Sequence, residues 1–377
     1  MKFKTYYSTN DSFLLALEEI KRSIKEDFGE YDFLFLGIHP QYAIEHINRD
    51  IKRVFDTDKY VGFHAINTFS DTNIVKGVSV GVFKFEKKGK VNIYRCDSLN
   101  NENLRKTKEY LNKRRKDTHF IIASLADEYF SFFLENLSLQ LDYYPIDNII
   151  GGISSGSKIG DEVMTYQFVE DEVLKDGFVI ISFENVCSKI DISLGFKPYG
   201  ITYEITKCDG NKIYTVDYEK NFADILRRIL KGIKNPKEEY LWHLPINIID
   251  DDGYVSTLRT VEKLEKDFVK VYGPVKKHQK FKLSFATKND LIEEDEKVSK
   301  RLCESMDDIE ATFNFSCVAR QYILSNRQFD EPKTYVRNFD THLFGFFTFG
   351  EIGPDKKYKK LKLYNETSLI CVMKEEE

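Results

Sequence analysis

Apolar and polar positions in the first half of the chain predict the same set of elements twice. In each set, a continuous apolar run typical of a buried strand leads into a segment with apolar residues at helical spacing. A second strand follows the helix, and a third strand follows a turn-rich stretch. The predicted strands are 33–38, 60–66 and 77–85 in the first set and 120–125, 148–153 and 177–183 in the second, with helices through 43–54 and 129–137.

A third and fainter copy of this set is predicted near the end of the chain. Its first strand is 312–317, its helix 318–325, and its later strands 343–349 and 368–373. An amphipathic helix with cap residues Asn10, Asp11 and Ser12 precedes the first copy. The segments between the second and third copies predict helices at 222–229 and 293–306 and strands at 254–260, 268–272 and 281–285.

These repeated units predict an α/β (α+β) fold. A strand–helix–strand step implies a right-handed parallel crossover, and the strand that follows it can pair antiparallel. Mixed β-sheets covered by helices are the expected result. The join between two halves is predicted near 215–221, which gives domains 1–217 and 218–377. Because no flexible linker marks this join, we expect the halves to pack closely.

Composition indicates a globular protein with a large aromatic core. Hydrophobic residues make up 42% of the chain, which has 30 Phe and 22 Tyr among its 377 residues. The net charge of −5 argues against a nucleic-acid partner. Two charged stretches, the basic 105–116 and the acidic 293–296, are therefore predicted to be solvated helix faces.

The chain also predicts a cytoplasmic location without membrane insertion. The N-terminus shows no apolar run of a secretory signal, and no apolar run approaches the roughly 18 residues of a membrane span. The six cysteines are scattered without a CxxC pair, which suits a reducing compartment.

One string resembles a catalytic motif. Residues 152–156 fit G-x-S-x-G, which presents a nucleophilic serine, here Ser154, between a strand and a helix. The segment after it reads as turn and strand, without the helix whose amides complete an oxyanion site. We expect a plain turn at Ser154 and no enzyme activity. Cys317, at the end of an apolar strand, is expected to be a buried small residue rather than a reactive thiolate.

Three charged residues beside apolar strands are the strongest candidates for a binding site. Arg259 and Arg320 follow or end such strands, and Glu351 ends another. Charged residues in these positions are rarely buried without partners. One interpretation is a structural Arg–Glu ion pair. The other is a pocket in which a guanidinium holds a carboxylate and Glu351 holds an ammonium group.

Several strings, taken together, resemble the FIST family. Residues 148–152, ending in Gly151-Gly152, and 193–200, containing Gly195, resemble the N-terminal FIST half, as do 202–210. In the C-terminal half, the resemblance lies in an arginine strand at 254–259, Ser-Cys-x-x-Arg at 316–320, Gly-aromatic-aromatic-x-aromatic-Gly-Glu-Ile at 345–352, and Asn365-Glu366-Thr367.

The resemblance implies a cytosolic sensory module of signal transduction that binds a small ligand, plausibly an amino acid or similar small polar metabolite. The chain shows no output domain, so a separate signalling protein is expected as partner. The ligand-binding residues that we predict are Arg259, Arg320, Glu351, Asn365, Thr367, Gly152 and Gly195.

Two alternatives stay open. One branch of the family resembles a haem-based nitric-oxide sensor, but Leu194 and Phe196 stand where many members have histidine and tryptophan. Haem is therefore not favoured, and no cofactor or metal is predicted, unless His64, His243 or His342 substitutes for that histidine. The other alternative is a protein-interaction scaffold without a small ligand.

Overall fold

The strand–helix–strand–strand unit predicted from the sequence is present three times, so the fainter third copy is confirmed. The computed structural model describes residues 1–124, 128–145, 147–159, 162–231 and 238–377. In each unit two strands run parallel, and the third strand pairs antiparallel with the first. The units are β2 (Phe33–Ile38), β3 (Tyr60–His64) and β6 (Val78–Lys84); β8 (Thr118–Ala123), β9 (Ile149–Ile153) and β14 (Phe178–Glu184); and β24 (Ala311–Cys317), β25 (Leu343–Thr348) and β28 (Ser368–Glu375).

Each unit gives a hairpin to the sheet of another unit. The hairpin of the first unit extends the third sheet, that of the second extends the first, and that of the third extends the second. An edge strand before each unit completes three six-stranded mixed sheets. The hairpins are β4–β5 (Thr68–Ser70, Asn73–Val75), β12–β13 (Gln167–Val169, Glu172–Leu174) and β26–β27 (Glu351–Asp355, Lys360–Tyr364), and the edge strands are β1 (Lys2–Ser8), β7 (Lys90–Cys96) and β15 (Val186–Ser193).

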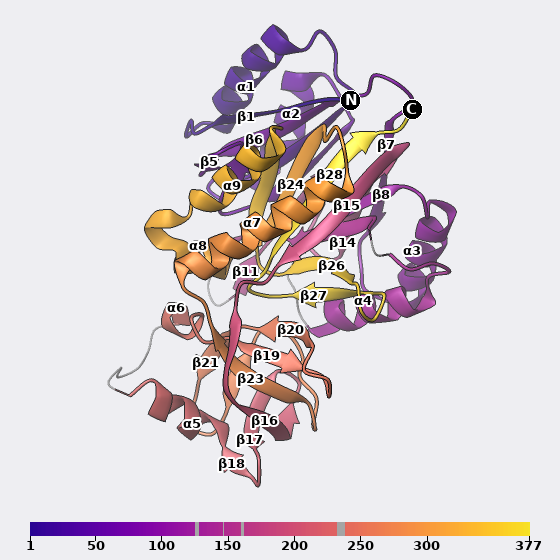
Figure 1. Cartoon of the computed structure of the whole chain (residues 1–377). Helices are drawn as coiled ribbons and strands as arrows, with labels where there is room; N and C mark the ends of the chain where they lie inside the picture. Colours follow the sequence, from indigo (N-terminus) through magenta and orange to yellow (C-terminus); the bar gives the residue numbers. More distant parts are fainter. Residues whose placement is uncertain (125–127, 146, 160–161, 232–237) are drawn as a thin grey trace.

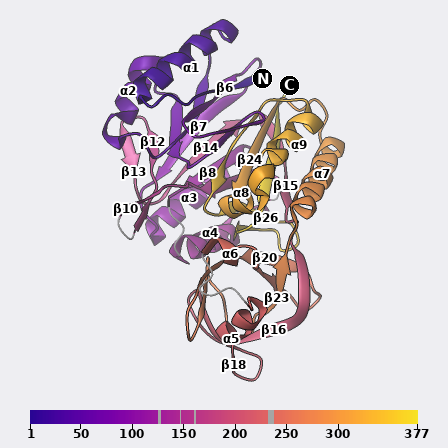
Figure 2. The same ribbon diagram turned by 90° about the vertical axis from the view of Figure 1, so that its left-hand side faces the viewer.

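Helices cover the outer faces of the three sheets (Figures 1 and 2). Their apolar stripes pack on the strands, while the faces toward solvent carry most of their charges. Capping residues set where some of these helices begin. Thr287 and Asp290, for example, form a capping box at the N-terminus of the helix that starts at Lys288. The helices are α1 (Phe13–Asp27) and α2 (Ile47–Phe55); α3 (Asn101–Lys113) and α4 (Glu128–Gln140); and α7 (Lys288–Ser305), α8 (Val318–Leu324) and α9 (Asp330–Phe339).

Phenylalanine rings fill the space between the inner faces of the sheets. Phe35, Phe120 and Phe313 occupy corresponding register positions in the three units. Ring centroids are 6.3 Å apart for Phe35 and Phe120 and 4.8 Å apart for Phe120 and Phe313. Such rings contribute large buried areas and tilted aromatic contacts. The core therefore joins all three units.

A fourth sheet is inserted between β15 and α7 and has its own apolar core. We call residues 197–287 the inserted domain; it lies at one end of the body formed by the three units (Figure 1). The predicted division at 217/218 falls between two of its strands. Its elements are β16 (Lys197–Asp209), β17 (Lys212–Val216), β18 (Lys220–Asn221), α5 (Phe222–Ile229), α6 (Glu238–Leu241), β19 (Ile246–Ile249), β20 (Val255–Arg259), β21 (Val261–Leu264), β22 (Val269–Val271) and β23 (Lys280–Phe285).

The predicted basic helix face is confirmed on α3. Arg105 pairs with Glu109, and Lys106 pairs with Glu102, all four being exposed. In the part of the chain that the structure describes, no helix is both long and apolar enough to cross a membrane.

Candidate functional site

Polar side chains gather where the parallel strands of the third unit end. Corresponding positions of the exchanged hairpins carry Thr68, Gln167 and Glu351, which lie opposite Phe346, Phe63 and Gly152 in the ladders. Residues paired in this way share a face, so all three side chains point to the interior that the phenylalanines fill. Of these three side chains, that of Glu351 alone carries a carboxyl group.

Glu351 is fully buried but well supplied with hydrogen bonds. Its carboxylate accepts from the Thr348 hydroxyl, and from the Thr367 hydroxyl (2.7 Å) and main-chain N–H (3.2 Å). Burial raises the pKa of Glu351 to about 8, against the effect of these donors. Gly152 leaves room for this arrangement, because a Cβ there would lie 2.5 Å from Cγ2 of Thr348.

Glu366, two residues before β28, is the least satisfied group of the site. Its side chain is fully buried, and its backbone is left-handed, with a φ of +59°. Neither carboxylate oxygen accepts a hydrogen bond of ordinary geometry from the described residues. Burial raises the pKa of Glu366 to about 8, and the charge of Glu351 adds to this, while Thr260 and Arg320 oppose it. Buried, unsatisfied groups with unfavourable backbone angles cluster at functional sites.

Arg320, from α8, pairs with two carboxylates other than Glu351. Its Nη2 lies 2.9 Å from both oxygens of Asp295 on α7, and its Nε lies 3.2 Å from Oε2 of Glu331 on α9. Tyr335 donates to Asp295, and Asn314 donates to Glu331. Although burial disfavours the charge, the two carboxylates raise the pKa of Arg320 above its usual range. The remaining nitrogen, Nη1, has no partner among the described residues.

The prediction of a solvated face for 293–296 is wrong for Asp295. Asp295 is fully buried, because it lies four residues after Leu291 and three before Val298 on the face of α7 that packs inward. Helical spacing therefore outweighs the acidic run. The ion pair with Arg320 offsets part of the cost of burying the charge, although burial still raises the pKa of Asp295.

Arg259 lies where the inserted domain meets the third unit's hairpin. It is buried and donates to main-chain carbonyls of Pro274 (3.2 Å), Leu258 and, in β27, Leu363 (3.3 Å). Burial lowers the pKa of Arg259 to about 10. The next residue, Thr260, reaches Glu366. The inserted domain thus contacts the segment 363–366 directly.

The other predicted site residues divide into two groups. Asn365 and Thr367 flank Glu366, and Oδ1 of Asn365 has no partner among the described residues. Gly195 has a φ of +67°, and a Cβ there would lie 2.8 Å from Leu291 at the start of α7. It therefore serves the turn into the inserted domain, and its near neighbours do not belong to the polar cluster.

Matches to known protein families cover most of the chain. The FIST N domain matches residues 32–219, and the FIST C domain matches residues 223–354. An uncharacterised protein of Aquifex aeolicus (strain VF5) is 36% identical over 262 residues, which is 67% of this chain and 96% of the relative. This chain belongs to the FIST family. FIST domains are associated with sensory functions in signal transduction.

Three strings that carry the FIST resemblance converge at the polar cluster. Residues 316–320 join β24 to α8, residues 345–352 cover β25 and the start of β26, and residues 365–367 precede β28. The main-chain N–H of Cys317 donates to the Thr367 carbonyl, which ties the first string to the third. Cys317 is buried as predicted, and burial raises the pKa of its thiol well above its usual value.

Ser154 lies in a strand–turn–strand segment, as predicted. β9 leads through Ser154 to β10 (Ser157–Ile159), which pairs with β11 (Glu162–Met164). The Ser154 side chain is fully buried and accepts a hydrogen bond from the Gln167 amide (3.0 Å). An amide cannot remove a proton, so this contact does not activate the hydroxyl.

The three histidines considered as haem ligands lie in different surroundings. His342 bonds Asp71, and His243 is exposed. His64 is buried, without a hydrogen bond to either ring nitrogen from the described residues, and burial lowers its pKa to about 4. A haem at His64 would require the Tyr166 and Phe168 rings, with centroids 5.3 and 5.2 Å away, to move.

Sequence reasoning missed Glu366, Asp295, Glu331 and Thr260. Two of them carried a usable signal. Glu366 is the middle residue of the Asn-x-Thr string, and Asp295 follows Leu291 at helical spacing. Glu331 reaches the cluster only through the tertiary fold, and so does Thr260, although it directly follows the predicted site residue Arg259.

Proposed function

We propose that this FIST protein is a sensor of a small polar ligand, an amino acid or similar metabolite, which binds at the cluster of Glu366, Asn365, Arg320 and Glu351. The observation that carries this proposal is Glu366, a fully buried carboxyl group in a left-handed backbone without an ordinary hydrogen bond. A buried polar group in this condition costs roughly 1–3 kcal/mol. A ligand that satisfies it recovers that free energy.

The unpartnered atoms of the cluster favour a zwitterion. The acceptors are the two oxygens of Glu366 and Oδ1 of Asn365, and the donor is Nη1 of Arg320. An ammonium group has three N–H bonds to donate, and a carboxylate accepts from a guanidinium. An α-amino acid carries both groups. Glu351 places a second carboxyl group near that of Glu366.

The inserted domain is positioned to respond to the ligand. Thr260 and Arg259 hold the segment that contains Glu366 and Leu363. Tyr254 also bonds Asp355, and Lys357 pairs with Asp250, across the same junction. The junction can have one arrangement with Glu366 at Thr260 and another with Glu366 drawn away from it. A ligand that binds one arrangement more tightly shifts the equilibrium toward it by that difference in affinity. A separate signalling protein would read the change, and no catalytic step is proposed.

A thermal-shift panel of the twenty protein amino acids tests the proposal. At a ligand concentration of 100 Kd, binding stabilises the folded state by about 2.7 kcal/mol, which raises Tm. We expect one or a few amino acids to raise Tm, and their N-acetyl and amide derivatives to have no effect. Glu366→Gln should abolish the shift, because a neutral amide does not pair with an ammonium group.

Glu45→Gln, a change at an exposed position, is the matched control and should keep the shift. If no amino acid raises Tm, or if Glu366→Gln responds as the unchanged protein does, the proposal is wrong. A scaffold without a small ligand predicts the first of these results. Labelling of Ser154 by a fluorophosphonate probe would contradict the non-catalytic assignment.

A further inference from the structure

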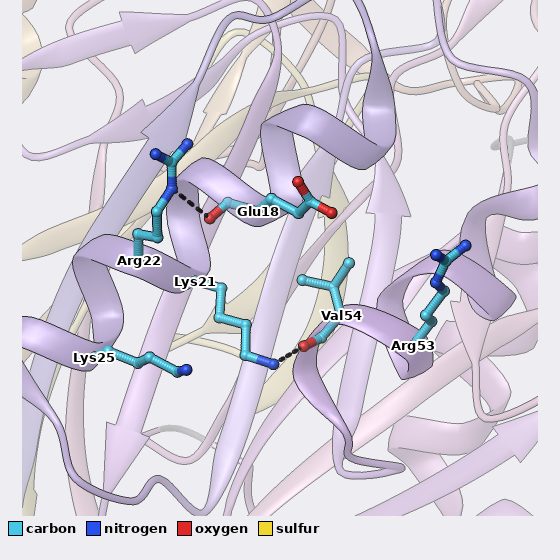
Figure 3. A pocket seen from close by; sticks show the side chains of 6 residues that line it. All are labelled: Glu18, Lys21, Arg22, Lys25, Arg53 and Val54. Atoms are coloured by element: carbon cyan, nitrogen blue, oxygen red, sulfur yellow. Dashed lines mark hydrogen bonds between the residues drawn. The ribbon is translucent and has the colours of Figure 1, made fainter.

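A groove between α1 and α2 collects cations on the outer face of the first sheet (Figure 3). Its volume is about 340 Å³, and its lining residues are Glu18, Lys21, Arg22, Lys25, Arg53 and Val54. Four cations and one carboxylate face this groove in a chain whose net charge is −5. α1 and α2 lie at the end of the body away from the inserted domain (Figure 1), so the groove is separate from the Glu366 cluster.

The cations of the groove lack carboxylate partners. In the described part of the chain, no salt bridge involves Lys21, Arg22, Lys25 or Arg53, whereas Lys52 on α2 pairs with Asp58 and Asp171. Lys21 donates to the carbonyl of Val54, and Arg22 donates to the carbonyl of Glu18 (Figure 3). The exposed cations Arg22, Lys25 and Arg53 therefore keep charge to offer to another molecule.

Two nearby acidic side chains, Glu19 and Asp27, are engaged elsewhere, whereas Glu18 lines the groove itself. Glu19 accepts from Ser8 and Asn10, and Asp27 accepts from Lys4 and Tyr6. Part of the pattern stabilises the helices, because a cation near a helix C-terminus interacts favourably with the helix dipole. Lys21, which bonds the last turn of α2, fits that role. The exposed Arg22 is not needed for it.

We propose that this groove docks an acidic segment of a partner protein. Residues 18–25 extend about 10 Å along α1 at 1.5 Å per residue. Alternate side chains of an extended peptide are about 7 Å apart, so two or three carboxylates reach the cations together. Membrane surfaces and duplex DNA present much longer negative surfaces. The net negative charge of the rest of the chain repels such surfaces more than it repels a short peptide. The proposal does not depend on the ligand at Glu366.

Fluorescence anisotropy with a fluorescein-labelled octaglutamate peptide tests this docking surface at low salt. We expect Arg22→Gln/Lys25→Gln/Arg53→Gln to weaken binding at least tenfold. The matched control is Arg105→Gln/Lys106→Gln/Lys108→Gln on α3, which removes the same charge and should change Kd less than twofold. Circular dichroism of both triple variants checks that they fold.

Equal weakening in the two triple variants, or no binding of the peptide to the unchanged protein at 1 mM, would overturn the proposal. Phosphatidylserine vesicles and a short DNA duplex serve as competing probes. Tighter binding of either one than of the peptide, with the same dependence on the three groove cations, would assign the groove to that class instead.

Discussion

Two buried ionic groups of this FIST protein lie close together and differ in one respect. The guanidinium of Arg320 holds Asp295 and Glu331, and Tyr335 and Asn314 satisfy the carboxylates further. Glu366 is equally buried, close enough for the charge of Arg320 to affect its pKa, and yet has no ordinary hydrogen bond. In the first group both carboxylates are satisfied, and Nη1 of the guanidinium alone lacks a partner among the described residues. In the second group both oxygens of Glu366 lack a hydrogen bond of ordinary geometry, which is why we centre ligand recognition on Glu366.

The largest expected effect comes from breaking the complete group. Glu331→Ala leaves the buried charge of Arg320 short of a partner and should lower the free energy of unfolding by about 3–5 kcal/mol. Urea denaturation measures this. Glu366→Gln, which removes no hydrogen bond of ordinary geometry, should leave stability at pH 7 unchanged or higher. If Glu366→Gln destabilises the fold as much as Glu331→Ala does, the proposed difference between the two buried groups is wrong.

Stability should fall as pH rises, because of Glu366 and Glu351. In the folded state both keep a proton up to a pKa of about 8, whereas an unfolded glutamate releases it near 4.5. The folded state therefore binds more protons between these values, and the free energy of unfolding decreases with pH in this window by a few kcal/mol. Urea denaturation at pH 5 and pH 8 measures the decrease. It should be smaller in Glu366→Gln and unchanged in the control Glu45→Gln.

A smaller effect is expected where the exchanged hairpin meets β9. Gly152→Ala places a Cβ 2.5 Å from Thr348 Cγ2, so Thr348, which donates to Glu351, must shift. We expect a loss of about 1–3 kcal/mol, as is typical of overpacking. Gly29→Ala, where nothing lies within 4 Å of the added carbon, is the control. Equal stability of the two variants in urea would show that the contact is not tight.

The smallest effect is expected on α3, far from both groups. Arg105→Gln removes an exposed pair with Glu109 and should change Tm by less than about one degree. A shift of several degrees in a differential scanning calorimetry scan would show that the charged face of α3 has a structural role beyond solvation.

The strands and helices of the three units follow closely from the sequence, because their apolar runs are long and regular. The run at 33–38 coincides with β2, and the faint third copy gives β24 and β25. The exchange of hairpins between units cannot be predicted from the sequence. β26 pairs with β9, some two hundred residues earlier, and no local pattern selects that partner.

The candidate site was predictable only in part. Glu351, Asn365 and Thr367 were expected from the sequence, and the structure brings them together around Glu366. The expected convergence of Arg320 with Glu351 takes a different form, because Asp295 and Glu331 hold that guanidinium. Partners on α7 and α9 depend on helix packing, which residue spacing along one segment does not encode.

The most direct test of the account is the number of protons released when an amino acid binds. Isothermal titration calorimetry at pH 7, in buffers of different ionisation enthalpy, measures it with the amino acid that raises Tm most. Free Glu366 holds a proton at this pH, and pairing with an ammonium group requires its release. We predict nearly one proton released per ligand in the unchanged protein and none in Glu366→Gln. Tight binding without proton release, equal in both proteins, would contradict the account.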